Sequence, residues 1–210
     1  MTSSKTEQVA GRAAVSVIVP SYNCGRFIAE ALDSILGQTL QVEQIVVVDD
    51  GSKDDTEKVV ARYTDPRVQY IKQNNAGVAS ARNTGLNACR GEFVTFLDAD
   101  DRWRPTFVEK MVRLLSEDLT VACVFSNFVR FQHATGEILK DQFQYYPELR
   151  QPVFYADAPH AHGRIPKELA FSVLVACGEI PAYTQVMMFR RSLIENTRFE
   201  QSLVLGEDTN

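Results

Sequence analysis

Short apolar runs alternate along the chain with segments whose apolar residues recur at helical spacing. Runs rich in β-branched residues predict five strands, over 15–19, 45–48, 68–71, 93–97 and 121–125. Helices are predicted to begin near Phe27, after the turn 51–55 with Ser52 as N-cap, at Gly77, and at Pro105 as a first helical position. Such alternation is typical of βαβ units.

The run Ile45–Val48 indicates the fold class because it is apolar without interruption. A strand that is apolar on both faces is expected in a parallel sheet covered by helices on both sides. Right-handed crossovers between successive units then give an open, doubly wound α/β sheet up to about residue 126.

Past residue 126 the regular spacing is lost. We expect an irregular hairpin and loops over 127–165 covering one end of the sheet, a helix over 167–177, a strand over 185–189 and a helical turn over 192–195. The polar start of the chain is expected to be a loose tail. The predicted organisation is a tail (1–13), an α/β half (14–126) and a third region of the same domain (127–210).

The composition is that of an ordinary soluble globular protein. Of the 210 residues, 45% are hydrophobic and 23% are charged, with a net charge of -5, which argues against a disordered chain and against a protein that mainly grips nucleic acid phosphates. The four cysteines form no CxxC pair, and we interpret them as reduced thiols. No apolar run reaches the roughly 18 residues that a membrane span needs.

Acidic residues follow two of the predicted strands. Asp49 and Asp50 end the second, and Asp98, Asp100 and Asp101 follow the fourth. Because ligands of open α/β sheets bind beyond the carboxyl ends of the strands, we expect five carboxylates to converge on one rim. Three of them lie within four residues, and their repulsion favours a bound divalent cation such as Mg²⁺ or Mn²⁺. The alternative is that these aspartates only cap turns and helices.

The segment 74–83 could complete a site for a phosphorylated ligand. Gly77 permits close backbone approach at a predicted helix N-terminus, where free N–H groups favour anions. Arg82 could reach the same rim or simply pair with a neighbouring carboxylate. Trp103 could stack on a sugar ring or pack at the sheet edge. His160 and His162 are interpreted as loop residues, since no third metal ligand is near them in sequence.

Five segments in order resemble glycosyltransferase family 2, whose members are inverting transferases with the GT-A fold. The segments are Val15–Asn23 (VSVIVPSYN), Val47–Ser52 (VVDDGS), Asn75–Asn83 (NAGVASARN), Phe96–Asp101 (FLDADD) and Gly206–Asp208 (GED). Any one of them is weak evidence. Together they extend the resemblance over nearly all of the chain from Val15 onward.

The resemblance implies a role for each matching residue. Pro20, Tyr22 and Asp50 would hold the nucleotide base of a sugar-nucleotide donor. The Asp-x-Asp element would place Asp98 at the ribose, Ala99 beside the donor and Asp100 on the divalent metal at the diphosphate. The loop through Gly77 and Arg82 would lie along the donor, and Asp208 would act as general base.

The resemblance also implies a GT-A type, mostly parallel sheet and a Mn²⁺- or Mg²⁺-assisted transfer from a nucleoside diphosphate sugar, with a UDP-sugar favoured. The acceptor would be a carbohydrate or lipid-linked hydroxyl, in polysaccharide or glycolipid biosynthesis. The donor would bind to the α/β half (14–126), and the region 127–210 would lie on the acceptor side and end at the base. We expect a cytoplasmic location, at the inner face of the membrane for a full-length protein. Because relatives usually continue past the base, we expect this chain to be C-terminally truncated.

Three other functions are considered. A nucleotidyltransferase would carry a glycine-rich basic loop after its first strand, where this chain has Pro20–Gly25. A phospho-receiver module would carry its acidic pair there and a lysine after the fifth strand, and neither is present. A family member that binds a sugar nucleotide without transferring the sugar would be expected to lack Asp100 or Asp208.

Overall fold

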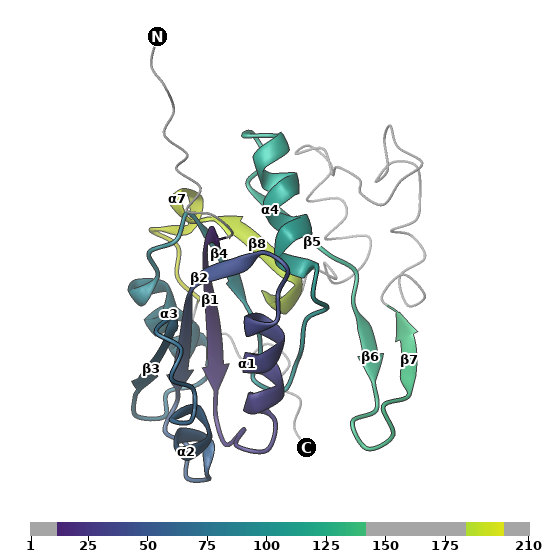
Figure 1. Cartoon of the computed structure of the whole chain (residues 1–210). Helices are drawn as coiled ribbons and strands as arrows, with labels where there is room; N and C mark the ends of the chain where they lie inside the picture. Colours follow the sequence, from purple (N-terminus) through teal and green to yellow (C-terminus); the bar gives the residue numbers. More distant parts are fainter. Residues whose placement is uncertain (1–11, 142–183, 200–210) are drawn as a thin grey trace, which may run out of the picture. The chain divides into compact units, whose positions relative to one another are not determined.

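The computed structural model describes residues 12–141 and 184–199, which belong to two compact units (Figure 1). The larger unit combines residues up to Val124 with those from Met187 onward, and the smaller one lies between them in sequence, from Phe125 to Val186. Each unit is considered by itself. The sequence-based assignment of donor and acceptor regions stays a prediction.

The larger unit alternates strands and helices as the sequence predicts. Its elements are β1 (Arg12–Ser21), α1 (Ile28–Leu36), β2 (Gln41–Asp49), α2 (Thr56–Val60), β3 (Val68–Lys72), α3 (Val78–Ala88), β4 (Phe93–Phe96), α4 (Phe107–Glu117), β5 (Cys123–Phe125), β8 (Met187–Arg190) and α7 (Arg191–Ile194). A 3₁₀ turn (Thr184–Val186) precedes β8. The smaller unit contains the antiparallel hairpin of β6 (Val129–Phe131) and β7 (Ile138–Asp141).

The main sheet has the order β3-β2-β1-β4-β8-β5. Strands β1 to β4 pair in parallel, which confirms the doubly wound α/β class, and β8 pairs antiparallel to β4. The sequence did not indicate that β8 would separate β4 from β5. Periodicity along the chain predicts where strands occur, but it does not predict which two strands a strand from a distant segment will lie between.

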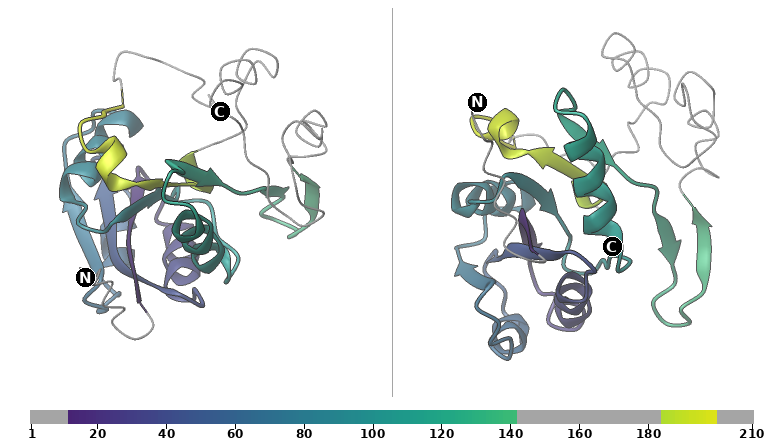
Figure 2. Two further views of the ribbon diagram at one scale, coloured as in Figure 1. Left: turned by 90° about the horizontal axis from the view of Figure 1, so that it is seen from above. Right: turned by 45° about the horizontal axis from the view of Figure 1, so that its top comes forward.

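Helices cover both faces of the sheet, as the apolar run of β2 predicted (Figure 2). Val15, Val17 and Val19 of β1 belong to one core with the buried faces of α1 and α4. Ile18, the intervening position, packs on the opposite face with Leu86 of α3 and Ile194 of α7. This alternation along one strand means that β1 is buried between two helical layers.

Several element boundaries differ from the predicted ones. Ser52 is not an N-cap: α2 begins at Thr56, with Asp55 preceding it. Pro105 lies two residues before α4, which begins at Phe107. The predicted helix over 167–177 lies outside the described residues, and the predicted strand over 185–189 is a 3₁₀ turn followed by β8. Among the described helices none is long and apolar enough to cross a membrane.

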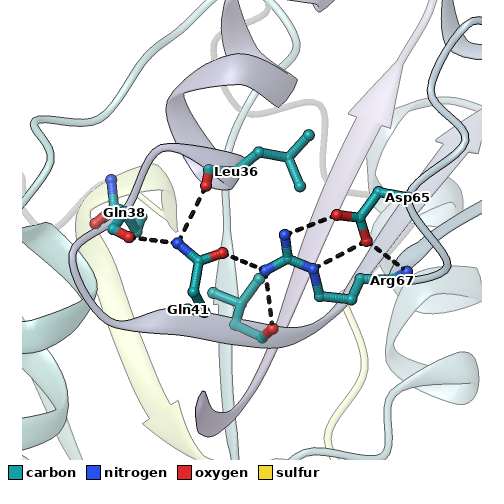
Figure 3. A network of polar contacts seen from close by, with 6 residues as sticks. Leu36, Gln38, Gln41, Asp65 and Arg67 are labelled. Carbon is teal, nitrogen blue, oxygen red and sulfur yellow. Dashed lines mark hydrogen bonds and ion pairs between the residues drawn. The ribbon is translucent and has the colours of Figure 1, made fainter. Parts of the chain in front are cut away.

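A polar network joins the amino ends of β2 and β3 to the end of α1 (Figure 3). Arg67 forms a two-pronged ion pair with Asp65, with Nε···Oδ1 2.9 Å and Nη2···Oδ2 2.8 Å, and also donates to Gln41. The Gln41 amide donates in turn to the carbonyls of Leu36 and Gln38. A charge-assisted, two-pronged pair fixes the relative orientation of its two groups. This network therefore holds the first residue of β2 in place, at the end of the strand opposite Asp49.

Gly85 lets α3 approach β1, and its replacement tests this packing. A Cβ at Gly85 would lie 2.3 Å from Ile18 Cγ2. We expect Gly85→Ala to lower the free energy of unfolding by about 1–3 kcal/mol, because overpacking a tight core forces shifts. Urea denaturation measures the change. Gly37→Ala is the control, since its φ is -83° and its added Cβ would contact only the Asp33 carbonyl, at 3.1 Å; an equal loss in both variants would contradict the packing argument.

Candidate functional site

The carboxyl ends of β1, β2 and β4 meet at one edge of the sheet. Parallel pairing places Ser21 opposite Asp49, and Ile18 opposite Phe96, so the segments that follow these strands emerge side by side. This edge, called the rim below, carries eight of the predicted site residues, which are Pro20, Tyr22, Asp50, Gly77, Arg82, Asp98, Ala99 and Asp100. The ninth, Asp208, lies outside the described residues, as do His160 and His162.

Asp50 is buried at the rim and organises the loop before α3. Its Oδ1 accepts hydrogen bonds from the Gln73 side chain (2.6 Å) and the Ala76 N–H (2.9 Å), and its Oδ2 accepts from the Gly77 N–H (2.8 Å). Its own N–H donates to the Ser21 carbonyl at 2.8 Å. Gly77, with φ +88°, makes the turn into α3. Asp50 therefore ties β1, β2 and the start of α3 together.

Asp49 is also buried, and it caps a turn. Its Oδ1 accepts from the Ser52 N–H at 2.7 Å, and its Oδ2 accepts from the Tyr70 hydroxyl. Burial, together with this carboxylate, raises the pKa of Tyr70 well above its usual 10. For Asp49 the structure thus supports the turn-capping alternative that the sequence left open.

Arg82 reaches the rim from α3 and pairs with Asp98. Its Nη2 lies 3.1 Å from Asp98 Oδ1, and its guanidinium lies over the Phe199 ring at 5.5 Å. The two alternatives for Arg82 are thus both realised, because the neighbouring carboxylate it pairs with is itself a rim residue. Its Nε is buried without a hydrogen-bond partner in the described structure.

The Asp-x-Asp element follows β4, with its middle residue buried and its last residue exposed. Ala99 is 2% exposed, and Asp101 donates its N–H to the Asp98 carbonyl at 3.0 Å to close the turn. This turn projects Asp100 into solvent. Within the described ranges, no hydrogen bond or ion pair involves the Asp100 carboxylate.

Three of the five carboxylates are compensated by donors of the protein itself, so charge repulsion supports a cation less strongly than the sequence suggested. Asp49 and Asp50 accept hydrogen bonds, and Asp98 pairs with Arg82. No group of three His, Cys, Asp or Glu side chains placed to hold a metal ion occurs in residues 12–141 and 184–199. Asp100 fits a hard divalent ion chemically, since it is an exposed oxygen donor.

Tyr22 and Pro20 differ sharply in exposure although they are two residues apart. Pro20 is buried in β1 opposite Val48, whereas Tyr22 is 48% exposed. An exposed aromatic ring at a ligand-binding edge can stack on a planar ligand.

For Trp103 the structure supports packing against the protein over an open ring available to a sugar. Its ring is stacked on Phe107 at 4.3 Å and packs against the core formed by α1 and α4. Two surface hollows, of about 130 Å³ and 200 Å³, both border Arg191 and Glu195 near α7. Neither includes a rim residue, so neither is the site described here.

The sequence did not single out Gln73 or Ser21. Gln73 donates to Asp50 and to Ser80, and it accepts from Thr84 at 2.6 Å, so it connects the rim to α3. Ser21 is buried and its Oγ has no hydrogen-bond partner of normal geometry in the described residues. Its position directly after an apolar strand was the signal available, because that is where ligand-facing residues of such sheets occur.

Comparison with known proteins gives one family over most of the chain. Residues 16–195 match the family described as Glycosyl transferase family 2. The chain is 33% identical over 203 residues to Glycosyltransferase GlyA of Streptococcus pneumoniae, covering 92% of this chain and 27% of that protein. It is 39% identical over 114 residues to Chondroitin synthase of Escherichia coli, covering 53% of this chain and 17% of that protein.

A solved structure agrees with the fold. The mannosyltransferase PcManGT from Pyrobaculum calidifontis, in complex with GDP-Man and Mn²⁺, superposes with a TM-score of 0.63 at 26% identity, covering 91% of this chain and 49% of that one. The chain thus spans half or less of the length of each of these relatives. What they bind or make is a property of those proteins.

The role of Asp50 in loop order is testable by Asp50→Asn. In either amide orientation an N–H₂ group would face a backbone N–H of the loop, at Ala76 or Gly77. We expect a loss of about 1.5–3 kcal/mol in the free energy of unfolding, because hydrogen bonds to a buried charged acceptor are lost. Urea denaturation measures this. Asp55→Asn serves as control, since that exposed carboxylate pairs only with Lys58 in the described structure; equal losses would contradict the assignment.

Proposed function

The chain belongs to glycosyltransferase family 2, and from that premise we propose that it transfers a sugar from a nucleoside diphosphate sugar to a hydroxyl acceptor with inversion of the anomeric centre. Membership in a transferase family of this kind disfavours the nucleotidyltransferase and phospho-receiver alternatives. The observation that carries the proposal is the rim itself. An exposed ring (Tyr22), a buried acceptor (Asp50) and an open carboxylate (Asp100) follow three neighbouring parallel strands.

In the proposed donor site, residues of the rim contact the donor along its length, from the base to the diphosphate. Tyr22 would stack on the base, and Pro20, buried at the end of β1, would support the backbone that leads to it. The Asp50 carboxylate has about four acceptor positions, of which three are used, so one remains for a base N–H. Through this free acceptor position, Asp50 would favour a base that presents an N–H donor to it over a base that does not.

The sugar and phosphate portions would lie toward α3 and β4. Asp98, held by Arg82, would accept from a ribose hydroxyl, and Ala99 would keep the turn close to the donor. The Gly77 segment would pass along the donor, and the lack of a side chain at Gly77 leaves room for it. Arg82 would lie beside the same part of the donor, since its Nη2 already contacts Asp98.

We propose that Asp100 contributes to binding Mn²⁺ or Mg²⁺, as an exposed carboxylate suited to a hard ion. When bound, such an ion would stabilise the charge that develops on the departing nucleoside diphosphate. PcManGT, which shares the fold, was solved with Mn²⁺ and GDP-Man. The carboxylate of Asp100 is the ligand this chain would supply from the rim.

Inversion requires attack from the face opposite the leaving group. The acceptor oxygen forms a bond to the anomeric carbon as the bond from that carbon to the diphosphate oxygen breaks, and the nucleoside diphosphate leaves with the electron pair. Asp208 would take the acceptor proton. Because a carboxylate of ordinary pKa, about 3.9, is a weak base for a hydroxyl, the proton would move late, when the oxygen is already bonding to carbon.

We propose a carbohydrate or lipid-linked acceptor, in the assembly of a polysaccharide or glycolipid. The likeness to a bacterial chondroitin synthase over half of the chain supports this class of product. The acceptor would contact the region 127–210 that the sequence assigned to it. A UDP-sugar is the favoured donor, with a GDP-sugar as the comparison in binding assays.

Asp100→Ala tests the metal assignment through binding. With Mn²⁺ and UDP or GDP at about 100 times Kd, wild-type protein should gain about 2.7 kcal/mol of stability, read as a rise in Tm. The variant should lose the Mn²⁺-dependent part of that rise. Glu43→Ala, which removes an exposed carboxylate paired with Arg90 near the opposite end of β2, is the control. An undiminished rise in Asp100→Ala would refute the assignment.

Asp208→Asn tests the general base. The amide cannot accept the acceptor proton, so transfer should fall by about 10²-fold or more, whereas the Kd for the nucleoside diphosphate should stay unchanged. Transfer is followed with a radiolabelled donor sugar and binding by calorimetry. Retained turnover in Asp208→Asn would rule out this role. If the wild-type chain itself binds the nucleotide but transfers no sugar, a sugar-nucleotide-binding protein without transfer activity is favoured instead.

A further inference from the structure

Two rim loops are joined by a set of hydrogen bonds that the proposed donor site does not use. The loop after β1 donates three backbone N–H groups to side chains of the loop after β2: Asn23 to Ser52 Oγ (2.9 Å), Cys24 to Thr56 Oγ1 (3.1 Å) and Gly25 to Asp54 Oδ2 (2.9 Å). Lys53 N–H donates back to Asn23 Oδ1 at 2.9 Å. We call these four bonds the clasp.

Two residues of the clasp, Asp54 and Thr56, are also hydrogen-bonded to each other. Asp54 Oδ1 accepts from both the N–H and the hydroxyl of Thr56, and Thr56 is fully buried. Burial tends to raise the pKa of Asp54, but its hydrogen bonds to Thr56 and Gly25 outweigh that effect and hold the pKa below its usual 3.8. Asp54 is therefore ionised at neutral pH and keeps its full accepting capacity.

Gly25 permits the close approach of the two loops. A Cβ at Gly25 would lie 2.9 Å from the Thr56 backbone nitrogen. The clasp also explains why the predicted N-cap was wrong. Ser52 Oγ accepts from Asn23 in the other loop, so α2 begins only at Thr56.

The backbone is fixed on both sides of Tyr22, by the sheet on one side and by the clasp on the other. On one side, Ser21 is paired with β2 and its carbonyl accepts from Asp50 N–H. On the other, Asn23 has φ +53°, a left-handed conformation that asparagine tolerates when its side chain is hydrogen-bonded locally. Because Lys53 N–H supplies that bond, the turn which sets the direction of the Tyr22 ring depends on the clasp.

The Tyr22 ring has little support of its own. It is 48% exposed, and its hydroxyl has no hydrogen bond in the described part of the chain. An unsupported ring loses conformational freedom when a ligand stacks on it, and a fixed backbone reduces that loss. We infer that Asn23 and Asp54, acting through the clasp, are positioning residues that present Tyr22 to the base of the nucleotide donor, an inference that rests on the proposed function.

The experiment compares ligands with and without a base. UDP and GDP are titrated by calorimetry in Mn²⁺, beside inorganic pyrophosphate, which has the diphosphate but neither base nor ribose. Asp54→Ala should raise the Kd of the tighter-binding nucleotide about five- to tenfold, because hydrogen bonds that hold the loop are lost. The pyrophosphate Kd should not change.

Two controls separate positioning from general damage. Asp55→Ala removes the adjacent exposed carboxylate, which belongs to no clasp bond, and should leave the nucleotide Kd unchanged. Asn23→Asp keeps a side-chain acceptor and should retain binding, whereas Asn23→Ala should weaken it about as much as Asp54→Ala. Far-UV circular dichroism and Tm establish that each variant is folded.

A double-mutant cycle gives the decisive outcome. Tyr22→Ala alone should weaken nucleotide binding at least about fivefold, as expected for loss of base stacking. Adding Asp54→Ala to it should weaken binding no further, because there is then no ring to present. Additive effects, or equal losses for pyrophosphate, would overturn the inference while leaving the proposed function intact. If Tyr22→Ala has no effect on nucleotide affinity, the base contact in the proposed function fails as well.

Discussion

A buried carboxylate at the end of β2 constrains the whole rim. Asp50 is only 3% exposed, so its charge must be compensated largely by protein donors. Those donors are the Gln73 side chain and the N–H groups of Ala76 and Gly77, which brings the loop before α3 to the ends of β1 and β2. The position of α3, and with it the reach of Arg82, follows from that contact.

The acidic rim divides into side chains that hold the protein together and one that is left open. Asp49 and Asp50 use their oxygens on turns and loops, and Asp98 is balanced by Arg82 at 3.1 Å. Asp100 extends into solvent at the next turn. Three of the five carboxylates are therefore held by donors of the protein, whereas the oxygens of Asp100 stay exposed.

Patterns within single segments predicted most of the larger unit. The strands β1 to β4 and the helices α1 and α3 were expected within a few residues of their observed bounds, because periods of two and 3.6 report burial directly. The helix starts predicted from Ser52 and Pro105 were wrong, because the preference of a residue type for a cap or a first helical turn is weak when other contacts compete for its hydrogen-bonding groups. Ser52 donates its backbone N–H to Asp49 and accepts from Asn23, and both contacts favour a turn over a helix start.

The sequence by itself determined the alternation of strands and helices, the parallel class of the sheet, the family and the rim on which its motifs gather. Burial periodicity and the rule that parallel strands end at one edge are enough for the sheet and the rim, whereas the family was indicated by the five motif segments in their order. Only the tertiary structure decided that β8 inserts between β4 and β5, that Arg82 pairs with Asp98, and that the Asn23 and Asp54 loops hold each other. Those contacts join residues from about 15 to nearly 100 positions apart, where the outcome depends on which donors and acceptors meet in space and not on any local period.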